Sequence, residues 1–376
     1  MDAIPYGRQS IDDGDVDAVV AALRSEYLTT GPRVAEFEAK IAARAQTPEA
    51  VAVINGTAAL HAAYAAAGIG PGDEVIVPAL TFAATATAAL QLGAKVVFAD
   101  VQEDTGNLEP TAAAAAVTSA TRAVVGVDYA GHPVDAADLK EVASRQGAVF
   151  VEDAAHSIGS MLAGRAVGSL ADLTTFSFFP TKNLTTGEGG AVVGADSELM
   201  KRVRAFREHG MVRNAASLRN PDVGPWHQEV QSLGLNYRLP DVLCALGSSQ
   251  LDRLDLFKHA RTKIFDRYVE ELAGVEGLRV PTRRADASPM WHLFPLRVAA
   301  ERRREVFEDL RGRGILVQVN YIPVYWHPLF EDLGYRKGMC PVAEQYYREE
   351  ISLPMFAGLT DADQGRVIDA VLEAVK

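Results

Sequence analysis

Short, largely apolar runs alternate with helical patterns through the first half of the chain. The runs predict strands at Val51–Ile54, Val75–Val77, Val96–Phe98, Ala123–Val127, Ala148–Val151, Thr174–Phe178 and Ala191–Val193. Helical patterns lie between them at Thr57–Ala67, Ala83–Leu92 and Leu139–Arg145. Apolar strands that alternate with helices indicate a mostly parallel sheet that is covered on both faces.

An amphipathic helix is predicted near the N-terminus. Val16, Val19, Val20 and Leu23 recur at helical spacing, and Asp12 stands before them as a candidate N-cap. The sequence YLTTGP, which follows the helix, is typical of a loop.

The pattern changes after about residue 241. The later elements are predicted as a long helical stretch at Leu243–Leu272, strands at His292–Val298 and Leu316–Tyr321, and helices at Arg302–Arg313, Ala343–Glu349 and Asp361–Val375. We therefore expect an α/β protein with two domains. The large sheet domain would comprise residues 1–240, with an N-terminal arm at 1–30, and a smaller α+β domain would comprise residues 241–376.

Composition and charge narrow the possible functions. Hydrophobic residues make up 48% of the 376 residues and charged residues 23%, which is typical of a soluble globular protein. The 37 basic and 49 acidic residues give a net charge of −12, which disfavours a nucleic-acid partner. The eight histidines lack the paired spacing of metal ligands, so we expect no metal.

Cysteine usage and hydropathy favour a cytoplasmic protein without a membrane partner. Cys244 and Cys340 are far apart and make no disulfide framework, which suits a reducing compartment. The first ten residues lack the apolar core of a signal peptide. The longest alanine-rich stretch, Thr81–Leu90, is far too short to cross a bilayer.

Lys182 is the first candidate for chemistry. It follows an apolar strand and three aromatic residues in FSFFPTK, and it precedes the glycine-rich segment TTGEGG. A lysine held between a buried strand and a tight turn can lose solvent, which favours the neutral amine that forms imines. The alternative is an ordinary surface lysine.

Asp153 lies at the end of the predicted strand Ala148–Val151. Ligands of open parallel sheets bind beyond the carboxyl ends of the strands. A carboxylate at this position suits pyridoxal phosphate, whose ring works as an electron sink when its nitrogen stays protonated. The alternative is a helix cap, and both roles are compatible.

The segment Asn55–Ala58 (NGTA) is a candidate phosphate site, because it joins a predicted strand to a predicted helix. Gly56 allows a close turn, and the amides of Thr57 and Ala58 would open the helix toward an anion. An ordinary helix cap is the alternative interpretation.

Two further residues are candidates for contacts with the same cofactor. The Ser177 hydroxyl could add a phosphate contact, and Phe82 could stack on the ring. For a lone aromatic residue such as Phe82, a place in the core is the alternative.

Taken together, these segments resemble the sugar aminotransferases of the DegT/DnrJ/EryC1/StrS family. Order and spacing agree throughout, and the resemblance extends from Ile4 to Thr360, nearly the whole chain. The segments that carry it are Asn55–Leu60 (NGTAAL), Thr81–Phe82, Glu152–His156 (EDAAH), Thr175–Phe178 (TFSF), Lys182 and Gly187–Gly190 (GEGG).

Within the family, the chain is most similar to enzymes that aminate C4 of UDP-linked 4-keto-6-deoxy-N-acetylhexosamines, as in pseudaminic acid biosynthesis. The supporting segments are Ile4–Ser10, Tyr27–Pro32, Gly224–Trp226, Leu233–Arg238, Val319–Pro323 and His327–Pro328.

The resemblance implies a fold-type-I transferase that binds pyridoxal phosphate and works as a homodimer with shared active sites. Asn236 would come from the partner chain and reach the cofactor phosphate, and His156 would lie near the phenolic oxygen of the cofactor. The residues that would contact the nucleotide-linked sugar are Tyr6, Tyr27, Leu28, Thr29, Tyr321 and His327.

The implied reaction is transamination of a nucleotide-linked 4-keto-6-deoxy sugar with L-glutamate as the amino donor. Lys182 would move the proton and Asp153 would hold the protonated ring nitrogen. Two departures bear on the sugar: Asn55 stands where many relatives have serine, and Phe179 where relatives often have histidine or another polar residue. An aminotransferase acting at C3 or another carbon in an antibiotic-sugar pathway is therefore an alternative.

Three rival classes fit the sequence less well. Dehydratases that resemble this family carry histidine where this chain has Lys182. A non-catalytic sugar or cofactor sensor would not need Lys182, Asp153 and the phosphate turn together. A nicotinamide oxidoreductase needs a glycine-rich turn between a strand and a helix, whereas Gly68–Gly72 follows a helix and contains Pro71.

Overall fold

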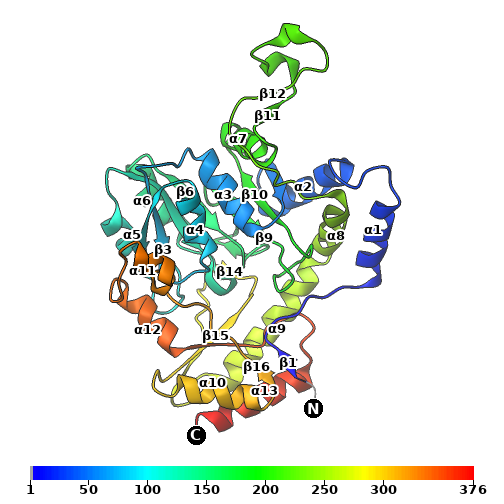
Figure 1. Ribbon diagram of the computed structural model, residues 1–376. Coiled ribbons are helices and arrows are strands. Elements are labelled where there is room, and N and C mark those ends of the chain that lie inside the picture. The colour runs from blue at the N-terminus through cyan, green and yellow to red at the C-terminus, as the bar shows by residue number, and fades with distance from the viewer. Residues whose placement is uncertain (1–2) are drawn as a thin grey trace.

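The computed structural model describes residues 3–376 (Figure 1). Seven strands form the central sheet in the order β2 (Glu49–Val53), β10 (Gly190–Gly194), β9 (Leu173–Ser177), β6 (Val149–Asp153), β5 (Thr121–Val127), β3 (Glu74–Pro78) and β4 (Lys95–Ala99). All are parallel except β10, which is antiparallel to both neighbours. The predicted sheet is confirmed, and each predicted strand overlaps one of these seven.

Alternate side chains of each strand pack against opposite layers of helices. In β3, Val75 and Val77 belong to one core cluster and Ile76 to the other, as the two-residue period of a strand requires. Buried residues of α3 (Gly56–Ala66), α4 (Ala84–Gln91) and α7 (Ser197–Arg207) complete the first cluster, and those of α2 (Pro32–Ala45), α5 (Pro110–Ala116) and α6 (Ala136–Arg145) the second. The patterning did not predict α2 and α7.

The later part of the chain adds a smaller unit with its own core. Its antiparallel sheet has the order β13 (Leu278–Arg279), β15 (Phe294–Val298) and β17 (Glu350–Leu353), and its helices are α9 (Leu254–Leu272), α10 (Arg303–Gly312) and α13 (Asp361–Ala374). The third core cluster joins residues of these elements to Ile4. The N-terminal strand β1 (Ile4–Pro5) therefore belongs to this unit, where it pairs with β16 (Ile315–Leu316).

The predicted helix Leu243–Leu272 is two helices that meet at Arg253. The first, α8 (Asp241–Asp252), packs against α1 (Asp13–Leu23) and α2 of the large unit, and α9 continues into the small unit. The domain boundary near residue 241 stays a prediction. The packing of α8 argues for a boundary closer to the start of α9.

The predicted strand Leu316–Tyr321 is wrong beyond Leu316. Gln318 makes an isolated bridge to Ser352, and the Asn320 amide donates to the Glu350 carboxyl over 2.8 Å instead of pairing with a strand. Apart from this single bridge, the segment 318–321 forms no strand, and it lines a cavity described below. Two short helices, α11 (Pro328–Asp332) and α12 (Pro341–Glu349), follow it.

Helix α1 (Asp13–Leu23) begins as predicted, with Asp12 as the N-cap of a capping box. Its predicted apolar face does not point into the protein, however. Val16 and Leu23 are about half exposed, whereas Asp15 and Ala22 are buried. The Gln250 side-chain amide donates to Asp15 over 2.6 Å, so a polar contact attaches α1 to α8.

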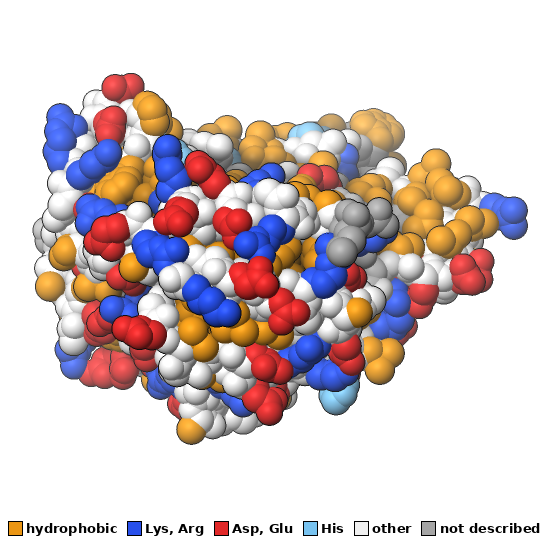
Figure 2. Space-filling view, turned by 90° about the horizontal axis from the view of Figure 1, so that it is seen from below, with side chains coloured by type: hydrophobic (Ala, Val, Ile, Leu, Met, Phe, Trp, Pro, Cys, Tyr) orange, Lys and Arg blue, Asp and Glu red, His pale blue; other side chains and the backbone are white. Residues whose placement is uncertain are grey.

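A hairpin formed by β11 (Met211–Val212) and β12 (Glu229–Val230) projects from the large unit beyond α7 (Figure 1). It carries exposed apolar side chains, among them Trp226 (77% exposed) and Leu233 (91% exposed). Figure 2 shows acidic and basic side chains mixed over the face seen from below. Hydrophobic side chains gather there on the projection at the right, the side on which α1 lies in Figure 1. Among residues 3–376, no helix has the length and hydropathy needed to cross a membrane.

Candidate active site

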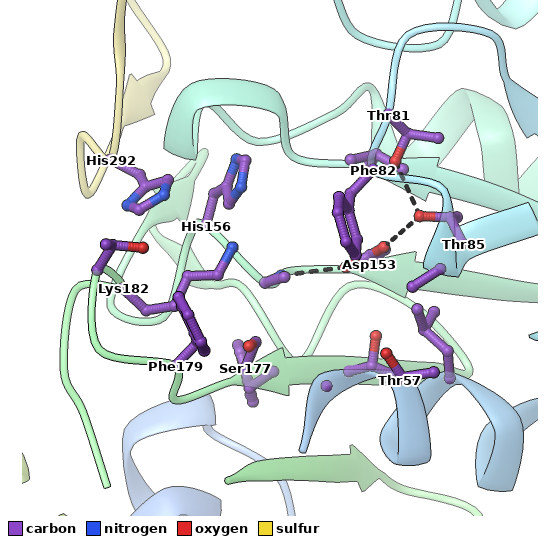
Figure 3. Close-up of a pocket in the computed structure, with 18 of the residues that line it drawn as sticks. Thr57, Thr81, Phe82, Thr85, Asp153, His156, Ser177, Phe179, Lys182 and His292 are labelled. Atoms are coloured by element: carbon purple, nitrogen blue, oxygen red, sulfur yellow. Dashed lines mark hydrogen bonds between the residues drawn. The ribbon is translucent and has the colours of Figure 1, made fainter. Parts of the chain in front are cut away.

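A cavity of about 590 Å³ lies at the carboxyl ends of the parallel strands and is closed by residues of the small unit. Asp153 at the end of β6 and Ser177 at the end of β9 form part of its lining. His292 and Tyr321 contribute from the other unit. Figure 3 shows the labelled side chains around this space. The position is the one expected for ligands of open parallel sheets.

Lys182 lies in the cavity on the turn that follows β9. Its amide donates to the carbonyl of Phe179 over 2.9 Å, which closes the turn and directs the side chain into the cavity (Figure 3). Burial lowers the pKa of the Lys182 ammonium to about 8, against the opposing attraction of Asp153. A substantial fraction of the amine is therefore neutral near physiological pH.

Asp153 lies in the same cavity and is 5% exposed. One carboxylate oxygen accepts a hydrogen bond from the Thr85 hydroxyl over 2.8 Å, and the other accepts from the amide of Ala155 over 3.2 Å. Burial raises the pKa of Asp153, and these two hydrogen bonds, followed by the charge of Lys182, oppose the rise. Thr85 was not predicted from the sequence.

The predicted phosphate turn also lines the cavity, at the start of α3. An added Cβ at Gly56 would lie only 2.8 Å from Cβ of Ser177, so glycine is needed for β9 to pack this closely. The Asn55 side chain accepts from the amide of Ala58 over 2.8 Å. The amide of Ala58 is thus used by a helix cap, as in the alternative interpretation, and its role toward a phosphate stays a prediction. The amides of Gly56 and Thr57 remain at the open end of the helix.

His156 is buried beside the cavity and contacts two residues that are distant in sequence. Its Nε2 lies 3.1 Å from the Tyr321 hydroxyl, and its ring lies 4.2 Å from that of His292. Burial, aided by the charge of Lys182, lowers the pKa of His156 well below its usual value. Its Nδ1 has no hydrogen-bond partner among the residues that the structure describes.

Two predicted aromatic residues stand at the open side of the cavity. Phe82 is 61% exposed and its ring lies 6.0 Å from that of Tyr321. The alternative that Phe82 is a core residue is therefore wrong. Tyr6 also lines the cavity, from the N-terminal segment that follows β1.

The remaining predicted site residues lie outside the cavity of this chain. Tyr27 and Leu28 are about half exposed, and Thr29 is exposed in the same loop. Asn236 is exposed on the base of the hairpin, where it bridges Glu208, and His327 precedes α11. Their roles stay predictions.

Several lining residues were not named as site residues from the sequence. Thr81 and Asn320 lie in segments that carry the family resemblance, but no role was assigned to them. Thr85, His292 and Gln318 also line the cavity, and of these three only His292 carried a signal, as a polar residue at the start of an apolar strand.

Comparisons with known proteins agree with this geometry. The model of the DegT/DnrJ/EryC1/StrS aminotransferase family matches residues 9–372. The chain is 40% identical to the spore coat polysaccharide biosynthesis protein SpsC of Bacillus subtilis, and the match covers 99% of this chain and 97% of SpsC.

Two relatives have names that specify a substrate. A UDP-4-amino-4,6-dideoxy-N-acetyl-beta-L-altrosamine transaminase of Campylobacter jejuni is 36% identical over 99% of this chain and 98% of its own. A dTDP-3-amino-3,4,6-trideoxy-alpha-D-glucose transaminase of Streptomyces venezuelae is 37% identical over 96% of this chain and 92% of its own.

Solved structures share the whole fold. PseC of Helicobacter pylori, an aminotransferase of pseudaminic acid biosynthesis, is 30% identical and superposes with a TM-score of 0.93 over 99% of both chains. A protein of Streptococcus pneumoniae described as a sugar aminotransferase, solved in its PMP form, gives the same identity, TM-score and coverage. The predicted family and fold class are thus confirmed. The chain belongs to the DegT/DnrJ/EryC1/StrS aminotransferase family and is a sugar aminotransferase that depends on pyridoxal phosphate.

Proposed function

We propose that the protein transfers an amino group from L-glutamate to C4 of a nucleotide-linked 4-keto-6-deoxy sugar. The observation that carries the proposal is one cavity that holds a partly neutral lysine, a buried carboxylate and an open helix N-terminus. The substrate class rests on the sequence resemblance and on the named relative from Campylobacter jejuni.

The residues of the cavity fit pyridoxal phosphate. Gly56, Thr57 and Ser177 would hold the phosphate, because they combine amides at a helix start with a hydroxyl packed against them. The exposed face of Phe82 would cover the ring. The buried, unpartnered Nδ1 of His156 fits a polar neighbour such as the phenolic oxygen of the cofactor. When bound, the cofactor supplies an electron sink for the carbanion formed in transamination.

Lys182 would act as both nucleophile and proton carrier. Its lowered pKa makes the neutral amine available for covalent attachment of the cofactor. Once released by the amino donor, the same amine would take the proton from the α-carbon of glutamate. In the second half-reaction it would deliver a proton in the reverse sense, to the carbon of the sugar that receives nitrogen.

Asp153 would pair with the ring nitrogen and keep it protonated. Its side chain is fixed by Thr85 and by the amide of Ala155, so it reaches the cavity with little freedom. An ionised carboxylate in a buried site favours a nearby positive charge strongly, which is what a protonated ring requires.

The sugar nucleotide would contact Tyr6 and Tyr321, which line the cavity. We propose that a second copy of the chain completes the site. Tyr27, Leu28 and Thr29 are exposed in a loop next to the exposed apolar face of α1, and Asn236 is exposed at the base of an apolar hairpin. Exposed apolar surface of this kind is typical of an interface. His327 is assigned to the sugar nucleotide by resemblance only.

A C3 aminotransferase of an antibiotic-sugar pathway is the second candidate. It is favoured by the relative from Streptomyces venezuelae, whose identity of 37% is similar to the 36% of the C4 relative. Both candidates use the same cavity residues and differ only in the carbon that receives nitrogen.

The visible absorption spectrum of the purified protein tests the proposal. We expect an absorption band of lysine-bound cofactor that disappears with L-glutamate and returns with one member of a panel of nucleotide-linked 4-keto and 3-keto sugars. Return of the band with a 3-keto sugar alone would establish the second candidate. A protein that stays colourless with added pyridoxal phosphate would contradict both.

A further inference from the structure

Asp153 reaches the cavity without a cationic partner within salt-bridge distance among residues 3–376. Among the described residues, the only hydrogen bonds to its carboxylate come from the Thr85 hydroxyl and from the amide of Ala155. Burial favours the neutral acid, so these two donors must offset the loss of water if the carboxylate is to stay charged. The amide is part of the backbone, which leaves Thr85 as the side chain that can be tested.

Thr85 is in turn hydrogen-bonded to a second buried hydroxyl. The Oγ1 atoms of Thr81 and Thr85 lie 2.8 Å apart, and the two residues are 2% and 1% exposed. A hydroxyl has a single proton, and Thr85 gives its proton to the carboxylate oxygen of Asp153. Thr81 must therefore donate to Thr85, and the three groups form a directed chain (Figure 3). Such chains polarise each member and strengthen the last bond.

The backbone around Thr85 is fixed as well. The Tyr64 hydroxyl of α3 donates to the carbonyl of Thr85 over 2.9 Å, and Tyr64 is fully buried. Thr85 itself lies in the first turn of α4, so packing between α3 and α4 sets the position of its hydroxyl. The geometry is therefore prearranged before any ligand binds.

We propose that Thr81 and Thr85 form a hydroxyl relay that holds the Asp153 carboxylate ionised and aimed into the cavity. Both are positioning residues that act through Asp153, and the inference rests on the role proposed above for that residue. The relay would keep the ring nitrogen of the cofactor protonated, because it would keep the carboxylate charged although Asp153 is only 5% exposed. The other titratable groups near Asp153 are Lys182, His156, Tyr64, Tyr321 and Asp128, which follows the neighbouring strand β5.

The test compares Thr85→Val, which keeps the shape and removes the hydroxyl, with Thr85→Ser, which keeps the hydroxyl. Titration of the Asp153 carboxyl in the cofactor-free protein, followed by carbon NMR, gives a readout independent of activity. We expect T85V to raise the pKa of Asp153 and to weaken pyridoxal phosphate binding about tenfold or more, since a hydrogen bond to a charged group is lost. T85S should stay close to the wild type in both.

Thr81→Val provides the second test, because Thr81 does not touch Asp153. We expect a smaller shift in the same direction. The double variant T81V/T85V should bind the cofactor no more weakly than T85V alone, because Thr81 acts only through Thr85. Equal thermal stability of the variants at low pH would show that they fold alike.

The relay would be overturned if T85V titrated and bound pyridoxal phosphate like the wild type. Asp153→Asn separates this failure from a failure of the proposed function. An inactive D153N beside an unaltered T85V would refute the relay only, whereas a fully active D153N would refute the role of Asp153 itself.

Discussion

The candidate site has two parts, a floor and a rim, which differ in whether a single chain supplies all of their residues. The floor comes from strand ends and a helix start of one chain, and its residues are Gly56, Asp153, Ser177 and Lys182. Buried neighbours fix each of them: Ser177 packs on Gly56, and Thr85 bonds to Asp153. Because packed elements of a single chain position the whole floor, it can be complete before a ligand or a partner arrives.

The rim is defined by expected site residues that do not line the cavity of this chain and that are mostly exposed. Its expected residues, which lie in three separate segments outside the cavity, are Tyr27, Leu28, Thr29, Asn236 and His327. The loop and the hairpin that carry four of them present apolar surface to solvent. The residues proposed for the chemistry thus lie in a packed part of one chain, whereas Tyr27, Leu28, Thr29 and Asn236 lie in exposed segments whose proposed roles need a second chain.

The largest effect is expected at the floor. Lys182→Ala should abolish turnover, with a loss of more than about 10³-fold, because the nucleophile and the proton carrier disappear together. Steady-state transamination with a matched keto sugar measures the loss. Lys201→Ala is a suitable control, because Lys201 is an exposed lysine that forms a surface ion pair with Glu198. Appreciable turnover by K182A would refute the assignment of the floor.

The floor could be predicted from the sequence because each of its residues sits in a local pattern. Asp153 ends an apolar strand, Lys182 follows one, and Gly56 opens a helix after one. The carboxyl ends of parallel strands lie at the same edge of a sheet. Residues that end or follow such strands are therefore expected to line one cavity.

Other lining residues could not be predicted, because their places depend on contacts between distant segments. The ring of His292 lies beside that of His156, 136 positions away in sequence. Tyr321 lies 3.1 Å from His156 and follows Asn320, whose amide donates to the distant Glu350 carboxyl. The amphipathic pattern of α1 did not indicate that Val16 and Leu23 would be about half exposed. A periodic pattern indicates that one face of a helix is apolar. It does not indicate whether that face packs against the same chain or against another one.

The second effect tests whether the rim is shared between subunits. Lys182→Ala and Asn236→Ala should each impair activity alone, K182A almost completely and N236A through weaker binding of the cofactor phosphate. When the two variants are mixed and allowed to exchange subunits, one site of each mixed dimer regains both residues. We expect activity to rise well above the sum of the separate variants.

Subunit exchange also gives the result that would contradict sharing. If each chain uses its own Asn236, every site in the mixture remains defective and activity does not rise. Molar mass by light scattering accompanies the assay, so that a failure to exchange is detected. A protein that stays monomeric at assay concentration would refute the dimer directly.

The third effect perturbs the floor without removing a functional group. Gly56→Ala places a methyl group 2.8 Å from Cβ of Ser177, so the two elements must move apart at the phosphate end. Overpacking of this kind costs about 1–3 kcal/mol, and we expect cofactor affinity to fall roughly tenfold. The matched control is Gly70→Ala, because a Cβ at Gly70 meets nothing within 4 Å. Equal losses in both variants would show that the effect is general rather than local.

The smallest effect is the pH dependence of cofactor attachment. It depends on the protonation of Lys182, which belongs to the floor. The pKa of Lys182 is lowered to about 8 by burial, and attachment requires the neutral amine. The rate of pyridoxal phosphate incorporation into the cofactor-free protein should therefore rise with pH and level off above about 8. Below that value each unit of pH should slow it roughly tenfold.

The variant T85V sharpens this measurement. A lysine that stands near a carboxylate is held charged by it, so an Asp153 that loses its negative charge should let the Lys182 pKa fall. The plateau of incorporation should then begin at a lower pH than in the wild type, while T85S keeps the original profile. A profile that rises only near the ordinary pKa of lysine would show that the floor does not desolvate Lys182.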